Sequence, residues 1–436
     1  MNEHIDEAIA NFRRQYDKYA KPERYYAGMH DLAFATDKFK STFGTLFREF
    51  ALNLCPAICD AVRDKLRITG FSVDTADTFS TDASKKQVRR IWNDNRMRTR
   101  AGEVHKEALK CGDAYMIVWP NAAGDATLYP NRAASCSVIY DDELPGRIVR
   151  AAKYWQAADK RVCLNLYYID RIEKYVSKVV SEGSLPDASA FVSSAVIPNP
   201  FGVVPVFHFG NNADLGDPGR SELAAAIPIQ DGLNKSVLDM LVAMEYAAFR
   251  QRWAAGIETD YDAQGKPVAP FTAGVEQIWM SENPNAKFGD FNTANLEQFL
   301  RVKDSFRVDI ALVTGTPLHY FTPNITGTRS SDSLRRSESR FIAKVRDRQE
   351  SFGQVWSDVM SFALAIEGHG RSVRLLTEWE DPAPLSDREF LENILLKKQI
   401  GLPAADALIE AGYGQADAEK FAHERRETAP GGSTRP

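Results

Sequence analysis

Residues 221–255 have the sequence SELAAAIPIQDGLNKSVLDMLVAMEYAAFRQRWAA, and this stretch does most to decide the fold. Its apolar spacing predicts a long helix, and Gly256 is a suitable residue to end it. Pro228 either starts the main helix in its first turn or kinks a longer one. From Pro228 to Ala255 the helix would have 28 residues and a length of roughly 42 Å.

Within this helix, the segment from Val237 to Phe249 is apolar on nearly every side. Its only charged residues are Asp239 and Glu245. A helix with that pattern needs a neighbour to cover the side that would otherwise face water. The neighbour is either the protein's own core or an adjacent subunit.

The segments around this helix alternate between irregular and helical patterns. The loop NPFGVVPVFHFGN (199–211) precedes it. After it the sequence predicts an acidic, turn-rich segment at 257–292, a helix at 294–313, a loop at 315–331 and a second long helix at 333–366. Because a globular helix averages about 11–12 residues, two helices of this length indicate part of an assembly rather than a small-molecule enzyme.

Composition excludes several classes of protein. The chain has 436 residues, so it predicts two or three substructures. A net charge of -5 argues against a protein that grips nucleic acid over its whole surface. Five scattered cysteines predict buried thiols in a reducing, cytosolic setting. The charged N-terminus does not resemble a signal peptide, and no stretch approaches the roughly 18–20 apolar residues of a membrane span.

The flanking regions predict a mixed fold. Residues 1–68 and 85–110 have helical patterns, with a polar connector, GFSVDTADTFSTDAS, between them. From Gly112 to Phe209 short β-branched and aromatic runs predict an antiparallel meander, one face of which should pack on the preceding helices. Residues 181–195 are predicted as a loop. Further on, the sequence predicts a strand in RSVRLLTEWEDP (371–382) and short helices at 386–399 and 404–411.

Sequence motifs for catalysis are missing from this pattern. There is no phosphate-binding glycine loop, no paired CxxC, and the seven histidines stand singly, so no metal or cofactor site is predicted. His208 and Ser221 form a weak nucleophile–base pair without the usual GxSxG turn. Asp141 and Asp142 fall in a predicted turn. The alternating charges of Arg335–Arg348 favour a solvated or subunit-facing helix side over a phosphate site.

The order of several motifs resembles the portal proteins of tailed, siphovirus-type bacteriophages. The resemblance spans nearly the whole chain. It is carried by RYYAG (24–28), RDKLRITGF (63–71), GDAYMIVWP (112–120), IPNPFGVVPVFHFGN (197–211) before GRSEL (219–223), VTGTPLHYF (313–321), and SSDSLRRSESRFIAKVRDRQESFGQVWSDV (330–359) before TEWEDPAPLS (377–386).

The resemblance implies an α+β, mainly helical portal fold. Its parts would be a β-rich wing at 1–218 and 371–385, stem helices at 219–256 and 293–314, a clip at 257–292, a tunnel loop at 315–333, a long wing-to-crown helix at 334–370, and a short helical crown with a tail at 386–436. It also implies a ring, usually of about twelve copies, at one capsid vertex of the virion, assembled from chains made in the host cytoplasm. Double-stranded DNA would be packaged and ejected through its channel.

This architecture assigns expected roles to individual residues. The tunnel loop would face DNA through His319, Tyr320, Asn324, Thr326 and Arg329. The subunit interface would include Val237, Leu241, Met244, Phe249 and Trp253. The clip would dock partners through Glu258, Asp260, Asp262 and Glu276.

The expected partners are the terminase large subunit, a head-completion or adaptor protein, and the major capsid and scaffolding proteins, with no membrane, cofactor or enzymatic activity. An acidic chain with a mostly neutral loop suits a channel in which DNA must slide, because each neutralised phosphate adds affinity. The alternatives are another ring-forming head–tail adaptor, which would usually be shorter, and a capsid-associated enzyme with a buried pocket.

Overall fold

The computed structural model describes residues 3–31, 51–73, 78–181, 183–214, 218–248, 252–256, 263–266, 283–290, 296–322, 331–368 and 373–383, with isolated positions at 33–41 and 392–408. These residues form two compact units. The first contains Met1–Tyr16, Asp60–Ser221 and Thr326–Pro436, and the second contains Asp17–Cys59 and Glu222–Ile325. The structure is 47% helical and 25% strand, which confirms a mainly helical α+β fold.

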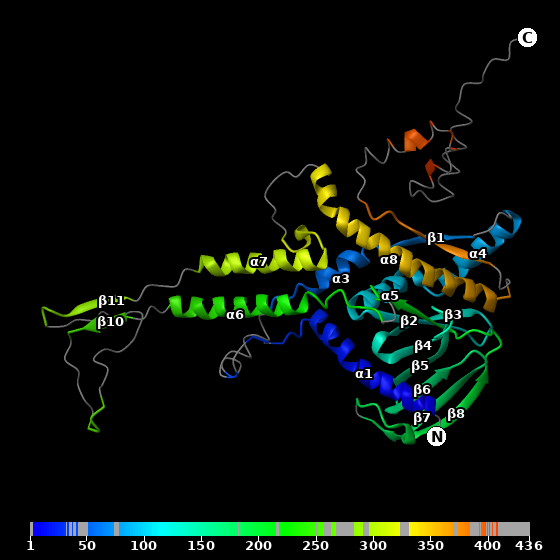
Figure 1. The fold of residues 1–436 in the computed structure, drawn as a ribbon, viewed down its shortest axis with the longest axis horizontal. Coiled ribbons are helices and arrows are strands. Elements are labelled where there is room, and N and C mark those ends of the chain that lie inside the picture. Colours follow the sequence, from blue (N-terminus) through cyan, green and yellow to red (C-terminus); the bar gives the residue numbers. More distant parts are fainter. Residues whose placement is uncertain are drawn as a thin grey trace, which may run out of the picture. The chain divides into compact units, whose positions relative to one another are not determined.

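A five-stranded antiparallel sheet in the first unit confirms the predicted meander (Figure 1). Its strands, in spatial order, are β4 (Cys136–Tyr140), β5 (Ile148–Gln156), β6 (Arg161–Tyr167), β7 (Arg171–Val180) and β8 (Phe191–Pro198). Asp141 and Asp142 lie in the turn between β4 and β5, as predicted. The prediction of a loop through residue 195 is wrong, because β8 begins at Phe191 and pairs with β7.

The first helix packs its apolar stripe on this sheet, as the sequence predicts. Helix α1 (Glu3–Tyr26) contributes Ile5, Ile9 and Phe12 to one buried cluster with Leu164 and Leu166 of β6. Because these helix residues recur at three- and four-residue steps, they form one continuous face. The ring of Phe12 meets Tyr154 of β5 edge-on, with 4.6 Å between ring centroids.

A second, three-stranded sheet has β2 (Asp113–Pro120) at its centre, between β3 (Ala126–Arg132) and β9 (Val206–Gly210). Sequence reasoning predicted β2 but not β3, and it placed β9 within a loop. Pro130 interrupts the strand pattern of β3, and it is tolerated there because β3 is an edge strand.

The first unit also contains three further helices, α4 (Thr78–Asp94), α5 (Met97–Cys111) and α8 (Ser331–Ile366), and a pair of antiparallel strands, β1 (Ile68–Val73) with β12 (Leu375–Trp379). Helix α8 confirms the second long helix. The prediction of a polar connector in GFSVDTADTFSTDAS is wrong, because β1 covers its first residues and α4 begins at Thr78. The core here contains Trp356, which is fully buried and donates a hydrogen bond from Nε1 to His105 Nε2 at 2.8 Å.

The second unit contains the other long helices. Helix α6 (Ile227–Ala248) and helix α7 (Glu297–Thr314) lie side by side (Figure 1). Along the chain, strands β10 (Arg252–Ala255) and β11 (Lys287–Asp290) stand between them and pair in antiparallel fashion. Because α6 begins at Ile227, Pro228 lies in its first turn. The prediction of helix through Ala255 is wrong, because residues 252–255 form a strand, and Trp253 is a strand residue.

Candidate functional surfaces

Helices α6 and α7 pack through a narrow set of residues. The ring of Phe306 lies against Gly232, where an added Cβ would approach within 3.1 Å. Leu233 of α6 and Ile310 of α7 are fully buried. The first half of α6 is enclosed within its own unit, because Val237 and Leu238 are also buried. The pair is therefore held together by one face of each helix.

The opposite face of α7 leaves large apolar side chains in contact with solvent. Leu300, Val308 and Leu312 recur at four-residue multiples on that face, and Leu312 is 66% exposed. Val302 and Val313 are also exposed. Exposed large apolar side chains are thus spread over the solvent side of α7, and a helix surface of this kind is a candidate interaction surface. We call these five residues the α7 outer face.

The predicted subunit-interface residues differ in their surroundings. Val237 is buried within its own chain, so it is not available to a neighbouring copy. Leu241 is half-buried, and Met244 is 47% exposed. Trp253 is exposed on β10 and its indole lies across Gly289 of β11. Phe249 lies outside the described residues. The sequence does not predict the α7 outer face. The spacing of its leucines and valines can be read from the sequence, but their exposure is seen only in the structure.

A buried polar cluster fixes the start of α6 in the second unit. Tyr25, which is fully buried, donates a hydrogen bond from its hydroxyl to Asp231 at 2.7 Å. Burial raises the pKa of Asp231. Burial also raises the pKa of Tyr25, and the hydrogen bond to Asp231 raises it further. The Gln230 side chain accepts from the Leu54 amide at 3.0 Å and donates to the Leu52 carbonyl at 2.8 Å. The RYYAG motif therefore anchors the first turns of α6.

The segment after α7 begins with a defined turn. Gly315 ends the helix in the left-handed conformation, with φ 66°, which glycine adopts without strain. The hydroxyl of Thr314 donates to the Ile310 carbonyl at 2.7 Å. A short 3-10 helix, η3 (Leu318–Tyr320), follows. It contains His319 and Tyr320, whose ring centroids are 4.6 Å apart and which are partly exposed.

The remaining predicted site residues are not described. Asn324, Thr326 and Arg329 of the predicted tunnel loop lie outside the described residues, as do Glu258, Asp260, Asp262 and Glu276 of the predicted clip. Their roles stay predictions.

The sequence pair His208 and Ser221 does not come together. His208 Nε2 is 2.8 Å from the fully buried carboxylate of Asp113, and its Nδ1 is 2.7 Å from the Tyr140 hydroxyl. Ser221 donates instead to the Lys110 carbonyl at 2.5 Å. The serine–histidine chemistry considered from the sequence is therefore not supported by geometry.

The Asp113 carboxylate also holds the chain just before Ser221. It accepts a hydrogen bond from the Gly219 amide at 2.8 Å. A Cβ on Gly219 would come within 1.9 Å of the Gly112 carbonyl oxygen, so the two backbones meet at glycines. Residues of the motifs GDAYMIVWP, HFGN and GRSEL therefore contact one another in the folded chain.

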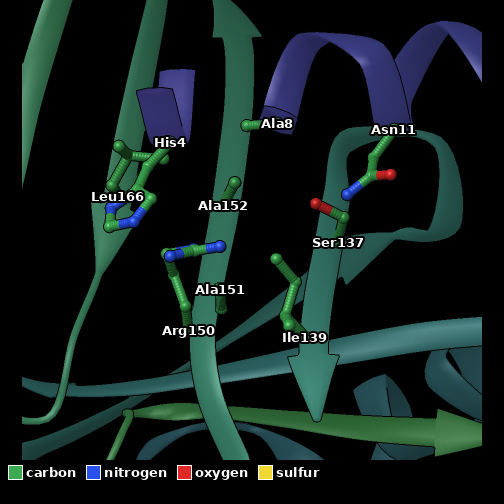
Figure 2. A pocket seen from close by; sticks show the side chains of 9 residues that line it. All are labelled: His4, Ala8, Asn11, Ser137, Ile139, Arg150, Ala151, Ala152 and Leu166. Carbon is green, nitrogen blue, oxygen red and sulfur yellow. The ribbon is translucent and has the colours of Figure 1, made fainter. Parts of the chain in front are cut away.

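A small hollow lies between α1 and the five-stranded sheet (Figure 2). His4, Ala8 and Asn11 line it from α1, and β4, β5 and β6 supply the rest. Its volume of about 10 Å³ accommodates one water molecule. Two of the polar side chains around it have partners, since His4 bonds to the Tyr168 hydroxyl at 2.8 Å and Arg150 pairs with Glu7. The hollow is too small for a substrate.

Across the described ranges, no group of three or more His, Cys, Asp or Glu side chains is arranged to hold a metal ion. In the same ranges no helix combines the length and apolar character needed to cross a bilayer. All five cysteines are free thiols, and only Cys163 is partly exposed. The described residues therefore offer an exposed apolar helix surface, rather than a pocket, as the candidate functional site.

Within the described residues, the exposed apolar side chains of α7 are therefore a stronger candidate for a functional surface than the small hollow beside α1. Comparison of the sequence with known families gives a match over residues 5–403 to the family described as Phage portal protein, SPP1 Gp6-like. Because this match covers most of the chain, the protein belongs to that family. The resemblance noted from the motifs is confirmed.

Two curated relatives are named Portal protein. The one from Mycobacterium phage L5 is 27% identical over 237 residues, which is 52% of this chain and 49% of the relative. The one from Mycobacterium phage D29 is 25% identical over 235 residues, covering 51% and 48%. The chain thus spans about half the length of the curated relatives it matches.

A solved structure described as the neck of a native GTA particle computed with C12 symmetry is 14% identical, with a TM-score of 0.49. It covers 88% of this chain and 95% of its own. That likeness is weak, and the family assignment rests on the sequence match.

Proposed function

We propose that this protein is the portal of a tailed phage: a closed ring at one capsid vertex, through which double-stranded DNA is packaged and ejected. Membership of the portal family supports this role. The observation that carries it is the α7 outer face, because an exposed apolar helix face needs a partner. In this role the protein is a structural component of the virion without catalytic activity.

The ring interface would be heterologous, with a different surface of each copy at its two sides. We assign the α7 outer face to one side. The half-exposed end of α6, with Leu241 and Met244, supplies the other side. Apolar burial at about 25 cal/mol per Å² would then favour association. A ring of about twelve copies is the size that the family resemblance suggests.

The other regions keep their proposed roles with revised bounds. The stem consists of α6 and α7, and the pair β10–β11 forms the base of the clip. Acidic residues of the clip, Glu258 among them, would dock the terminase large subunit and a head-completion protein. The wing and crown would contact the capsid and scaffolding proteins.

The segment after α7 would face the passing DNA. His319 and Tyr320 are partly exposed on η3, and Arg329 follows further along the chain. A surface that lets DNA slide should hold few phosphate contacts. We expect Arg329→Glu to change packaging while the ring still forms. Loss of the ring in this variant would contradict the assignment of the loop.

Negative-stain microscopy tests the ring directly. The full chain is expected to give rings with a central hole, and Leu312→Asp or Leu241→Asp is expected to abolish them. Leu144→Asp is the matched control, because Leu144 is 51% exposed in a turn of the first unit. Compact single particles from the unsubstituted chain would end the portal proposal. Intact rings from both interface variants would exclude the assigned interface.

A further inference from the structure

A basic segment stands out in an otherwise acidic protein. Residues 82–100 contain seven basic residues and two acidic residues, Asp82 and Asp94, whereas the whole chain has a net charge of -5. This segment forms α4, the turn after it and the start of α5.

Five of these cations are exposed and belong to no ion pair within the described part of the chain. They are Lys85, Lys86, Arg89, Arg96 and Arg98, which we call the basic face. Arg90 differs, because it pairs with Asp94 and with Glu367. Arg100 differs as well, since it donates to the Leu128 carbonyl. The basic face therefore presents charge that the described carboxylates do not neutralise.

The scaffold beneath the basic face is rigid. On the inner side of α4, Val88, Ile91 and Trp92 are buried. The Trp92 ring meets those of Phe71 and Trp356 edge-on, each at 5.2 Å between centroids. Lys85 and Arg89 stand one helical turn apart on the outer side, about 6 Å along the axis. The buried side of α4 therefore holds the backbone beneath this row of cations in place.

The chemistry of the surrounding surface distinguishes between partners. No large apolar side chain of α4 or α5 is exposed among the residues whose burial is described. A protein partner would normally meet an apolar or aromatic anchor at the centre of its interface. Polyanion backbones need only cations and hydrogen-bond donors, and arginine suits phosphate in particular. The observed surface fits the second case.

We propose that the basic face binds the phosphate backbone of double-stranded DNA without reading its sequence. This proposed contact differs from the one assigned to the tunnel loop. It uses none of the residues assigned to the tunnel loop, so its attraction for phosphate does not oppose sliding there. The proposal goes beyond the ring and does not require the assigned subunit interface.

The test compares two triple variants of the full chain. Lys85→Ala, Lys86→Ala and Arg89→Ala together remove three cations of the basic face, with alanine chosen to preserve the helix. Arg14→Ala, Arg67→Ala and Lys178→Ala remove three exposed cations elsewhere in the first unit. Both variants have the same net charge. Binding of a short fluorescent duplex of mixed sequence is followed by anisotropy between about 50 and 200 mM salt.

The basic-face variant is expected to bind DNA at least about tenfold more weakly, and its salt slope should fall by about 0.9 for each lost phosphate contact. The control variant should bind like the unsubstituted chain. Equal weakening in both variants overturns the proposal. Competition by polyglutamate as strong as by DNA also overturns it, because the partner would then be an acidic protein.

Negative-stain images of the same samples separate this inference from the portal proposal. Rings that persist in the basic-face variant, with weakened DNA binding, support both. A different outcome is possible if the chain forms no ring but the two variants still differ in DNA binding. That result would support the basic face as a DNA-binding surface and contradict the portal proposal.

Discussion

The α5–α8 core of the first unit and the α6–α7 pair of the second bury similar side chains to very different extents. Trp356 and Phe352 of α8 are fully enclosed, and the stack of His105 on Phe352 completes the packing. On α7, Leu312 and Leu300 face solvent. A long helix that belongs to a protomer's own core hides its apolar residues, whereas one that serves an assembly leaves them for a neighbour.

The largest expected effect is in the core. Trp356→Ala should lower the free energy of unfolding by about 3–5 kcal/mol, because it removes the indole and leaves a cavity. Urea denaturation measures this. Trp155→Ala is the control, since Trp155 is 38% exposed on β5, and it should change stability by far less. Similar losses in both variants would contradict the contrast between buried and open regions.

The second-largest effect is expected from acid, which should lower the stability of the same core. Burial lowers the pKa of His105 from 6.5 to about 3, because loss of water around the enclosed ring disfavours its charged form. Above pH 6.5 both states are neutral at this residue. As pH falls below 6.5, the unfolded chain binds the proton first, so stability drops by about 1.4 kcal/mol per pH unit.

Replacing His105 by phenylalanine removes this dependence while keeping an aromatic ring against Phe352. Unfolding measured from pH 7 down to pH 5 should therefore be less acid-sensitive in His105→Phe than in the unsubstituted protein. Parallel pH profiles in the two proteins would show that His105 is not the group responsible.

A smaller loss is expected where α6 begins. Tyr25→Phe removes the hydroxyl that serves Asp231 and should cost about 1–3 kcal/mol, since a buried carboxylate loses its donor. Thermal unfolding is a suitable measurement. Tyr16→Phe is the matched control, because Tyr16 is 63% exposed. A loss as large for Tyr16 would rule out the anchoring role of Tyr25.

The smallest effect on protomer stability is expected on the α7 outer face. Leu312→Ala should change the unfolding free energy of the dissociated chain by less than about 0.5 kcal/mol. Leu238→Ala on α6, where the side chain is buried, should cost about 2–5 kcal/mol. A large loss for Leu312→Ala in the dissociated chain would mean that the protomer itself uses this face.

The sequence predicted the regular elements with strong local patterns. The meander from β4 to β7 alternates apolar and polar residues, and α8 repeats its apolar residues over many turns, so both were found. Strand β1 was missed because its partner, β12, lies about 300 residues away and the six-residue strand contains Gly70. Non-local pairing of this kind leaves little trace in a short segment.

The candidate surfaces were predicted in part. The apolar character of α6 was evident, but its burial was not, because burial depends on α7 and on the cluster around Tyr25 and Gln230. The helix was extended too far because Arg252–Ala255 contains alanines and a tryptophan that suit a helix as well as a strand. Its pairing with β11 decides the outcome.

The mass of the purified full chain in solution tests the central claim most directly. Native mass spectrometry should give a closed assembly of many copies that Leu312→Asp converts to single chains and Leu144→Asp does not. A mass of 48.7 kDa for the unsubstituted protein, that of one chain, would contradict the account.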